Sequence, residues 1–217
     1  MSQNDDYIPA MGNFSLTFLY DPLMHLAMRE AAFKGRLIEQ ARLAPRQRVL
    51  DVGCGTGTLA VMIKLANPEV EVVGLDGDEK ILAVAQKKIA KSGMQITFDK
   101  AMSFDMPYSD DEFDRVLSSI MIHHLSAENK VLTFKEIFRV LKPGGEVHIA
   151  DFAASRGQMG HLASHMINLL IPLGHQPKDS LMEIMPRAGF SDVKDHGRFF
   201  TLFGTIGFFI GKKLADG

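Results

Sequence analysis

The chain has 217 residues, of which 46% are hydrophobic and 23% charged, and its formal net charge at pH 7 is −2. This is the composition of an ordinary soluble domain, long enough to bury a core that needs no disulfide or metal. The charge balance gives no sign of nucleic-acid binding, and the single cysteine excludes a disulfide framework or a multi-cysteine zinc site. The polar first residues and the broken apolar run at 199–210 predict neither a secretory signal nor a membrane span, so we expect a cytoplasmic protein.

Strands and helices alternate along the first two thirds of the chain. Helices are predicted at 22–44, from the glycine cluster to residue 66, at 78–91 and at 127–141. Strands are predicted at 48–52, 70–75, 95–98, 113–118 and 146–150. The last third is predicted to hold helices at 157–173 and 179–188, then two strands at 193–200 and 201–209 that could pair as a hairpin. Such alternation predicts a doubly wound, Rossmann-like α/β sheet with helices on both faces.

A glycine-rich segment lies between the first predicted strand and the next helix. It reads Asp51-Val-Gly-Cys-Gly-Thr-Gly57. Glycines let a ligand approach the backbone and permit the φ values of a tight turn. The G-x-G-x-G spacing differs from the G-x-G-x-x-G of dinucleotide-binding loops, and the Asp51 carboxylate opposes a pyrophosphate but suits a cation. The segment predicts a loop for a ligand with an ammonium and a sulfonium; a turn that binds nothing is the alternative.

The second predicted strand ends in Asp76-Gly77. An acidic residue after the strand that follows a glycine loop can accept hydrogen bonds from both hydroxyls of a ribose. Taken alone, Asp76 could equally be the N-cap of the next helix, with Glu79 as its capping-box partner. Beside the glycine loop, the ribose interpretation is favoured.

Five segments stand in the order seen in class I S-adenosylmethionine-dependent methyltransferases, and the chain resembles that family over residues 15–152. They are Asp51-Val-Gly-Cys-Gly-Thr-Gly57, Gly74-Leu-Asp76, Met106-Pro-Tyr-Ser-Asp-Asp-Glu-Phe-Asp114, His123-His-Leu125 and Val140-Leu-Lys-Pro-Gly-Gly145. The set looks most like the group that contains the ubiquinone/menaquinone-biosynthesis C-methyltransferases. The resemblance implies a seven-stranded, mostly parallel sheet with one antiparallel strand near its C-terminal edge, the predicted hairpin supplying the last two strands.

The resemblance also implies S-adenosyl-L-methionine as cofactor and S-adenosyl-L-homocysteine as product. The loop residues Gly53, Cys54, Gly55 and Gly57 would then lie under the methionine part, and Asp76 with Gly77 would hold the ribose. Many relatives carry Gly-Asp-Ala before a Leu-Pro-Phe element, but here Met102 and Ser103 fill the last two places. Adenine is therefore expected to rest on backbone groups and a thioether. Tyr20 would cover the cofactor, although Asp21 beside it suits a plain helix N-cap, and Ser119 ends the fourth strand.

His123 and His124 are the candidate catalytic residues, because they follow the fourth strand at the edge where open α/β sheets bind ligands. Methyl transfer from a sulfonium mainly requires positioning, and a base helps only where the nucleophile arrives protonated. The alternative is that one histidine packs under the next helix and the other faces solvent. Asp151 ends the fifth predicted strand and could contact the substrate, but a turn residue is the favoured role. His161 and His165 have no third ligand at suitable spacing, so no metal is expected.

The absence of several motifs narrows the range of methylation reactions expected for the chain. Ser118-Ser-Ile-Met121 lacks the Asn/Asp-Pro-Pro-aromatic motif of DNA amino-methylating enzymes and the Asp of metal-dependent catechol enzymes, and the lone cysteine excludes arsenite methylation. We expect methylation of carbon or oxygen in a small-molecule acceptor, with a quinol-like or lipophilic ring as the first guess. An NAD-dependent oxidoreductase and a non-catalytic cofactor-binding module are the alternatives. Residues 1–44 are expected to form a helical lid on a methyltransferase domain spanning 45–217.

Overall fold

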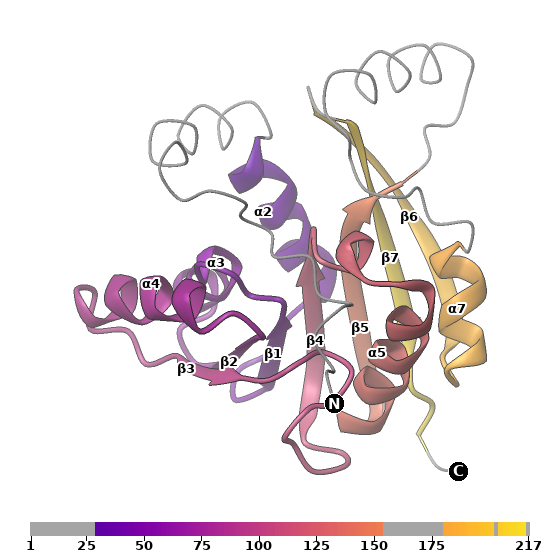
Figure 1. The fold of residues 1–217 in the computed structure, drawn as a ribbon, viewed down its shortest axis with the longest axis horizontal. Coiled ribbons are helices and arrows are strands. Elements are labelled where there is room, and N and C mark those ends of the chain that lie inside the picture. Colours follow the sequence, from indigo (N-terminus) through magenta and orange to yellow (C-terminus); the bar gives the residue numbers. More distant parts are fainter. Residues whose placement is uncertain (1–28, 154–179, 202–203, 216–217) are drawn as a thin grey trace, which may run out of the picture.

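The structure is a computed structural model that describes residues 29–153, 180–201 and 204–215. Helices and strands alternate along these residues as expected (Figure 1). The helices are α2 (Glu30–Ala41), α3 (Thr58–Ala66), α4 (Glu79–Ala90), the 3-10 turn η1 (Ile122–His124), α5 (Ala127–Val140) and α7 (Leu181–Arg187). The strands are β1 (Arg48–Val52), β2 (Glu71–Asp76), β3 (Thr97–Lys100), β4 (Phe113–Ser119), β5 (Leu141–Phe152), β6 (Ser191–Thr201) and β7 (Gly204–Lys212).

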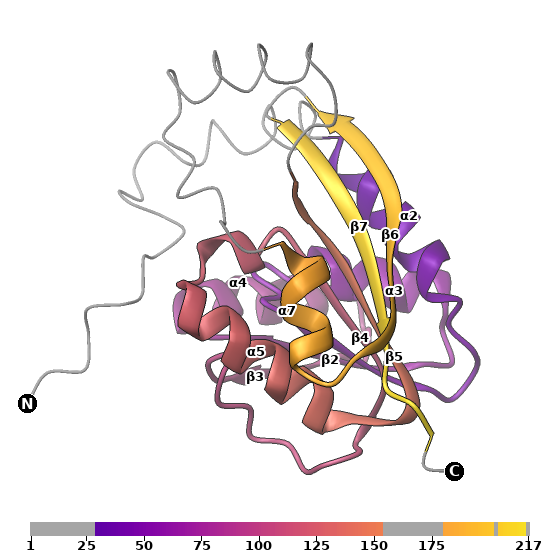
Figure 2. The same cartoon turned by 90° about the vertical axis from the view of Figure 1, so that its right-hand side faces the viewer.

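All the strands of the described chain belong to one seven-stranded sheet, ordered β3-β2-β1-β4-β5-β7-β6. The pairs from β3 to β5 are parallel, whereas β7 is antiparallel to both β5 and β6. Figure 2 shows β6 and β7 as long neighbouring strands that rise beyond the rest of the sheet. The predicted terminal hairpin and the single antiparallel strand near the C-terminal edge are confirmed.

Helices cover both faces of the sheet. On one face, Phe33 and Leu37 of α2 and Leu59 of α3 are buried against the strands. On the other face, Phe134 of α5 and Leu181 of α7 join a second buried cluster. Full burial of a large apolar side chain contributes about 1.5–3 kcal/mol. The two clusters therefore fix the sheet between its helices and hold the strand ends in place.

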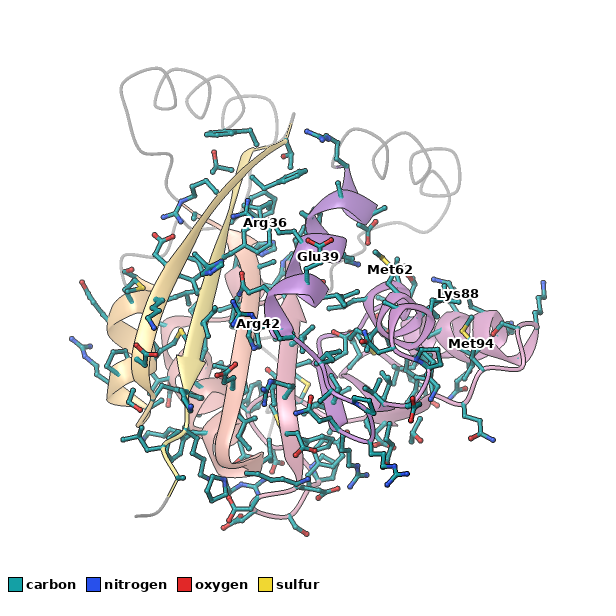
Figure 3. The ribbon with its side chains drawn as sticks, turned by 180° about the vertical axis from the view of Figure 1, so that it is seen from behind. Arg36, Glu39, Arg42, Met62, Lys88 and Met94 are labelled. Carbon is teal, nitrogen blue, oxygen red and sulfur yellow. The ribbon has the colours of Figure 1, made fainter. Side chains whose placement is uncertain are left out.

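Arg36 ties α2 to the last strands of the chain. Its guanidinium donates to the carbonyl oxygens of His196 at 2.9 Å and Arg198 at 3.2 Å, and it lies over the ring of Phe208, 4.4 Å from the centroid. Figure 3 shows Arg36 between α2 and the β6–β7 pair. The contact joins segments about 160 residues apart, so the first described helix and the far edge of the sheet are held together.

The structure excludes the alternative considered for Asp76 and corrects the start of one strand. The N-cap of α4 is Asp78, whose side chain accepts from the backbone N–H of Lys80 at 2.8 Å, so the capping role considered for Asp76 does not apply. Residues 142–145, which separate the helix predicted to end at 141 from the strand predicted to begin at 146, lie inside β5, which starts at Leu141. There the β4–β5 register shifts, and Gly144 adopts φ +80° and donates its N–H to Lys213. Leu141 and Glu146 pair with β4 on either side of these residues, so Pro and Gly form an irregularity within the strand instead of a turn before it.

The remaining bounds agree with the predictions to within a few residues. The β1 strand spans the predicted residues, β3 starts two residues later than expected, and α2 ends at Ala41 instead of residue 44. The α7 helix accommodates Pro186 because it ends one residue later. The predicted helix at 157–173, with His161 and His165, lies outside the described residues, as do residues 22–28 of the first predicted helix.

Candidate active site

The carboxyl ends of the parallel strands β1, β2, β4 and β5 meet at one edge of the sheet (Figure 1). The predicted site residues of the described chain lie at or near these ends. Because parallel strands present their carboxyl ends together, residues far apart in sequence meet there.

The glycine loop is tied to the end of β2 by three backbone donors. The N–H groups of Gly53 and Cys54 donate to the carbonyl oxygen of Leu75 at 2.8 and 3.0 Å. The N–H of Gly55 donates to the Asp76 carboxylate at 2.8 Å. Gly53, Gly55 and Gly57 all have left-handed backbone conformations, with φ of +70°, +53° and +72°. The predicted loop and the predicted acid therefore form one hydrogen-bonded unit.

The three glycines have different surroundings. A Cβ on Gly53 would lie 2.2 Å from Cγ of Met121, and one on Gly57 would lie 2.8 Å from Cζ of Phe98. A Cβ on Gly55 would meet nothing closer than 3.9 Å. Gly53 and Gly57 are thus required by the packing of the protein itself. Gly55 is left-handed but has room beside it.

Asp51 is a fully buried carboxylate at the end of β1. Neither of its oxygens has a hydrogen-bond partner among the residues that the structure describes. Burial raises the pKa of Asp51 to about 7. The charge of Lys34 and the backbone N–H of Ala60, which lies nearby but outside normal hydrogen-bond geometry, oppose this rise, and the charge of Asp76 reinforces it. An unpartnered carboxylate inside a protein is costly, and the arrangement suits a ligand that brings a cation.

Lys34, on the buried face of α2, was not predicted as a site residue. Its ammonium pairs with Glu30 one turn earlier, and burial lowers its pKa to about 8 against the opposing charge of Asp51. The sequence signal was a lysine on the same helical face as Leu37 and Ile38, next to buried positions. Asp51 and Lys34 together place a negative and a positive group near the glycine loop.

Asp76 uses both carboxylate oxygens to hold the local backbone. One accepts from Gly55 N–H at 2.8 Å and the other from Asp78 N–H at 3.0 Å. A Cβ on the following Gly77 would lie 2.7 Å from the sulfur of Met102, so that thioether packs closely on the turn. Ser103, the neighbour of Met102, shares a hydrogen bond of 2.9 Å with the hydroxyl of Thr133.

The carboxylates near Met102 differ in their surroundings. Asp99 accepts a hydrogen bond from the hydroxyl of Tyr108 at 3.0 Å, whereas Asp105 is exposed. Arg139 of α5 donates to the backbone oxygens of Met106 and Tyr108 at 3.1 and 2.6 Å. The segment after Met102 is therefore anchored to α5.

Lys88 of α4 lies beside the start of α3. Its ammonium donates to the hydroxyls of Thr58 at 3.2 Å and Thr56 at 3.5 Å, and Figure 3 labels it at this end of the molecule. Burial and the charge of Lys34 lower the pKa of Lys88. The glycine loop is thus flanked by two lysines, one from α2 and one from α4.

His123 is paired with Asp151 across the ends of β4 and β5. The His123 Nδ1 atom lies 2.7 Å from one Asp151 oxygen, and the backbone N–H of His123 donates to the other at 3.2 Å. The side chain of Asp151 is 3% exposed and that of His123 is 12% exposed. Asp151, expected to be a turn residue, instead orients a candidate catalytic histidine.

His124 lies against His123 with its ring centroid 3.9 Å away. Burial lowers the pKa of His124 to about 4, with further lowering by His123 and an opposing effect of Asp151, although the residue as a whole is exposed. His124 is therefore neutral at pH 7. Ser119 is half-buried at the end of β4, paired in register with Ala150.

Comparison with known proteins identifies the chain. A family model described as a methyltransferase domain matches residues 49–145, which include the glycine loop, Asp76 and His123. A demethylmenaquinone methyltransferase of Thermus thermophilus is 33% identical over 120 residues, covering 55% of this chain and 54% of that protein. An uncharacterised protein of Haemophilus influenzae is 32% identical over 178 residues, covering 79% and 69%. The chain belongs to the class I S-adenosylmethionine-dependent methyltransferases.

This methyltransferase family member falls in the group that contains the ubiquinone/menaquinone-biosynthesis C-methyltransferases. It spans about half the length of the first curated relatives that it matches. Its fold matches a phosphoethanolamine N-methyltransferase of Haemonchus contortus, solved with phosphomonomethylethanolamine and S-adenosylhomocysteine. That match has a TM-score of 0.69 at 19% identity and covers 84% of this chain and 52% of the other.

The structure brings most of the predicted site residues of this family member to one edge. Tyr20 lies outside the described residues. Sequence reasoning missed Lys34, and for Asp151 it favoured a turn residue over a role in the site. The described residues contain no group of three or more His, Cys, Asp or Glu side chains placed to hold a metal, and no helix among them is long and apolar enough to cross a membrane.

Proposed function

We propose that this protein transfers a methyl group from S-adenosylmethionine to a small-molecule acceptor at the carboxyl edge of the sheet. The observation that carries the proposal is Asp51, a fully buried carboxylate with no hydrogen-bond partner in the described chain, next to a loop with three left-handed glycines. Such a group lowers stability unless a ligand supplies a donor. The ammonium of the cofactor is that donor.

The residues at the edge fit the amino-acid and ribose parts of the cofactor. Asp51 would accept from the ammonium, and Lys34 would pair with the α-carboxylate. Each oxygen of Asp76 accepts one backbone N–H, which leaves lone pairs for the ribose hydroxyls. When bound, S-adenosylmethionine supplies a methyl group on a sulfonium, whose loss leaves a neutral thioether.

The other predicted cofactor contacts are part of the same proposal. Gly77 and Met102 would flank the adenine through backbone and thioether contacts, which the close packing of the Met102 sulfur on Gly77 supports. Ser103, Ser119 and Tyr20 complete the proposed set. Residues 1–44 would act as a lid on a domain formed by 45–217.

For the acceptor we propose a quinol-like ring, methylated on carbon or oxygen. The support is the similarity to proteins named demethylmenaquinone methyltransferase, which covers only about half of their length. The solved N-methyltransferase of similar fold also has a small-molecule acceptor. We further propose a cytoplasmic protein, since it has one cysteine, buried in the glycine loop.

Calorimetric titration of ligand-free protein with S-adenosylhomocysteine tests the cofactor, with Gly55→Ala as the diagnostic variant. Gly55 and Gly93 are both left-handed, and a Cβ on Gly93 would meet nothing within 4 Å, so Gly93→Ala is a matched control for strain. Each variant should lose about 1–2 kcal/mol of stability. Only Gly55→Ala should also lose affinity, by about tenfold or more, because its methyl group blocks the approach of the ligand.

Three outcomes would overturn the proposal. The first is no binding of S-adenosylhomocysteine alongside micromolar binding of NADH, which indicates an oxidoreductase. The second is equal affinity in Gly55→Ala and the wild type, which removes the loop from the site. The third is binding without methyl transfer from tritiated S-adenosylmethionine to any acceptor in a panel of reduced quinones, phenols and amines, which indicates a non-catalytic module.

A further inference from the structure

We propose that Asp151 positions His123 as a general base that removes a proton from a hydroxyl group of the acceptor. This inference rests on the proposed function and narrows the acceptor to molecules whose nucleophile is released by losing an O–H proton, such as a ring bearing a phenolic hydroxyl. His123 would be the catalytic residue, and Asp151 a positioning residue that acts through it.

The geometry of the pair fixes which nitrogen can accept a proton. An ionised carboxylate only accepts hydrogen bonds, so at 2.7 Å from Asp151 the Nδ1 atom of His123 carries the hydrogen. The Nε2 atom then holds the lone pair. The same arrangement of an acid behind a histidine orients the base in other enzymes that deprotonate a hydroxyl. Nε2 is thus the atom that would receive the proton.

Asp151 is held in a single orientation by the surrounding backbone. One of its oxygens accepts from the N–H of Phe152 at 2.7 Å as well as facing Nδ1, and the other accepts from the N–H of His123 at 3.2 Å. The His123 ring also meets the edge of Phe152, with centroids 4.9 Å apart and planes at 85°. A histidine fixed on two sides is oriented before any ligand arrives, which favours a role in proton transfer.

The base lies at the correct edge of the sheet. The η1 turn, which carries His123, begins three residues after the end of β4, and Asp151 is the next-to-last residue of β5. Ile120, between the strand and η1, adopts φ +52°, a costly conformation for a β-branched residue. The strained link turns the chain so that His123 stands next to β5. Backbone strain of this kind is common where a side chain must be aimed.

The neighbouring titratable groups favour His123 over His124 as the base. Among the described residues, Asp151 and His124 are the titratable groups that contact the His123 ring. His124, with its pKa lowered to about 4, holds a proton poorly at neutral pH. Asp151 holds the His123 ring in place, and the proton that Nε2 accepts passes to water after each turnover.

The first test is the tautomer of His123, read by long-range ¹H–¹⁵N correlation NMR on protein labelled in its histidines. The wild type should show a protonated Nδ1 and an unprotonated Nε2. In Asp151→Asn the amide can donate to Nδ1, which moves the hydrogen to Nε2. A wild-type His123 with its hydrogen on Nε2 would overturn the inference without any acceptor being needed.

The second test measures single-turnover transfer from tritiated S-adenosylmethionine to a reduced, prenylated 1,4-naphthoquinone as a function of pH. His123→Ala and Asp151→Asn should slow transfer by about 10²–10⁴-fold at pH 7. The loss should shrink as the pH approaches about 10, where the phenolic hydroxyl ionises without help. The matched controls are His196→Ala and Asp192→Asn, at exposed positions on β6, which should transfer at the wild-type rate.

Affinity for S-adenosylhomocysteine, measured on the same samples, separates the two proposals. If the wild type does not bind S-adenosylhomocysteine, the proposed function itself is contradicted. If His123→Ala binds the cofactor product with wild-type affinity and transfers the methyl group at the wild-type rate, only the role of the base is contradicted. The same holds if its rate is lowered by the same factor at every pH. A wild type that binds the cofactor but does not methylate the naphthoquinol would contradict the acceptor class.

Discussion

Replacing Asp51 by asparagine should stabilise the ligand-free protein at neutral pH. Burial raises the pKa of Asp51 from 3.8 to about 7, so its carboxyl group favours folding when protonated. That stabilising effect is fully present below the unfolded pKa and is lost as the pH rises through the folded pKa. Asparagine does not titrate. The difference in unfolding free energy between variant and wild type therefore isolates the ionisation of this one side chain.

The magnitude follows from the two pKa values. Between pH 5 and pH 7.5 the wild type should lose about 2.5 kcal/mol relative to Asp51→Asn, by the linkage between protonation and folding. For a chain of this size that corresponds to about 5–10 °C in melting temperature. The upper pH is kept below the pKa of Lys34, about 8, so that the lysine keeps most of its charge during the comparison.

The assay is thermal and urea unfolding of both proteins at the two pH values, without cofactor. Asp105→Asn serves as the control. Because Asp105 is exposed, the difference in unfolding free energy between this variant and the wild type should not change with pH. The same Asp51→Asn protein should bind S-adenosylhomocysteine more weakly. A stability difference that does not change with pH would refute the reasoning, because it would mean that Asp51 is solvated or paired in the ligand-free protein.

Two further predictions concern the loop and the acid beside it. Asp76→Ala should weaken S-adenosylhomocysteine binding by about 1.5–3 kcal/mol, the range for hydrogen bonds to a charged group; calorimetry that finds wild-type affinity would remove Asp76 from the ribose site. Gly57→Ala should lower the free energy of unfolding by about 1–3 kcal/mol, because its Cβ would press on Phe98 at 2.8 Å in a left-handed backbone; urea unfolding at the wild-type midpoint would contradict this.

The order and type of the elements could be predicted because they depend on local patterns. Arg48–Val52 is a continuous apolar run before glycines, and its strand has the predicted bounds. The start of β5 could not be predicted in this way. Pro143 and Gly144 favour a turn locally, but the hydrogen bond from Gly144 to Lys213 and the pairing of Leu141 and Glu146 with β4 on either side keep them within the strand. Contacts between residues distant in sequence determine where such a strand begins.

The site was predicted unevenly for the same reason. The glycine loop and Asp76 are adjacent to strand ends whose order the alternation already implies. The pairing of His123 with Asp151 spans 28 residues and depends on β4 and β5 being neighbours in register. The role of Lys34 depends on how α2 lies over the end of β1, which a helical pattern alone does not determine. Asp76 was ambiguous because an acid before a helix suits an N-cap as well as a ribose, and only the structure shows that Asp78 is the cap.

The contact between Arg36 and β6 also affects how molecules of this protein meet one another. The β6 strand ends the sheet, and an open edge can pair with a strand of another molecule and start aggregation. Two of its carbonyl oxygens, those of His196 and Arg198, already accept from Arg36, and Gly197 between them adopts φ +108° at a break in register. The edge is therefore interrupted midway, and this disfavours edge-to-edge association between copies of the chain.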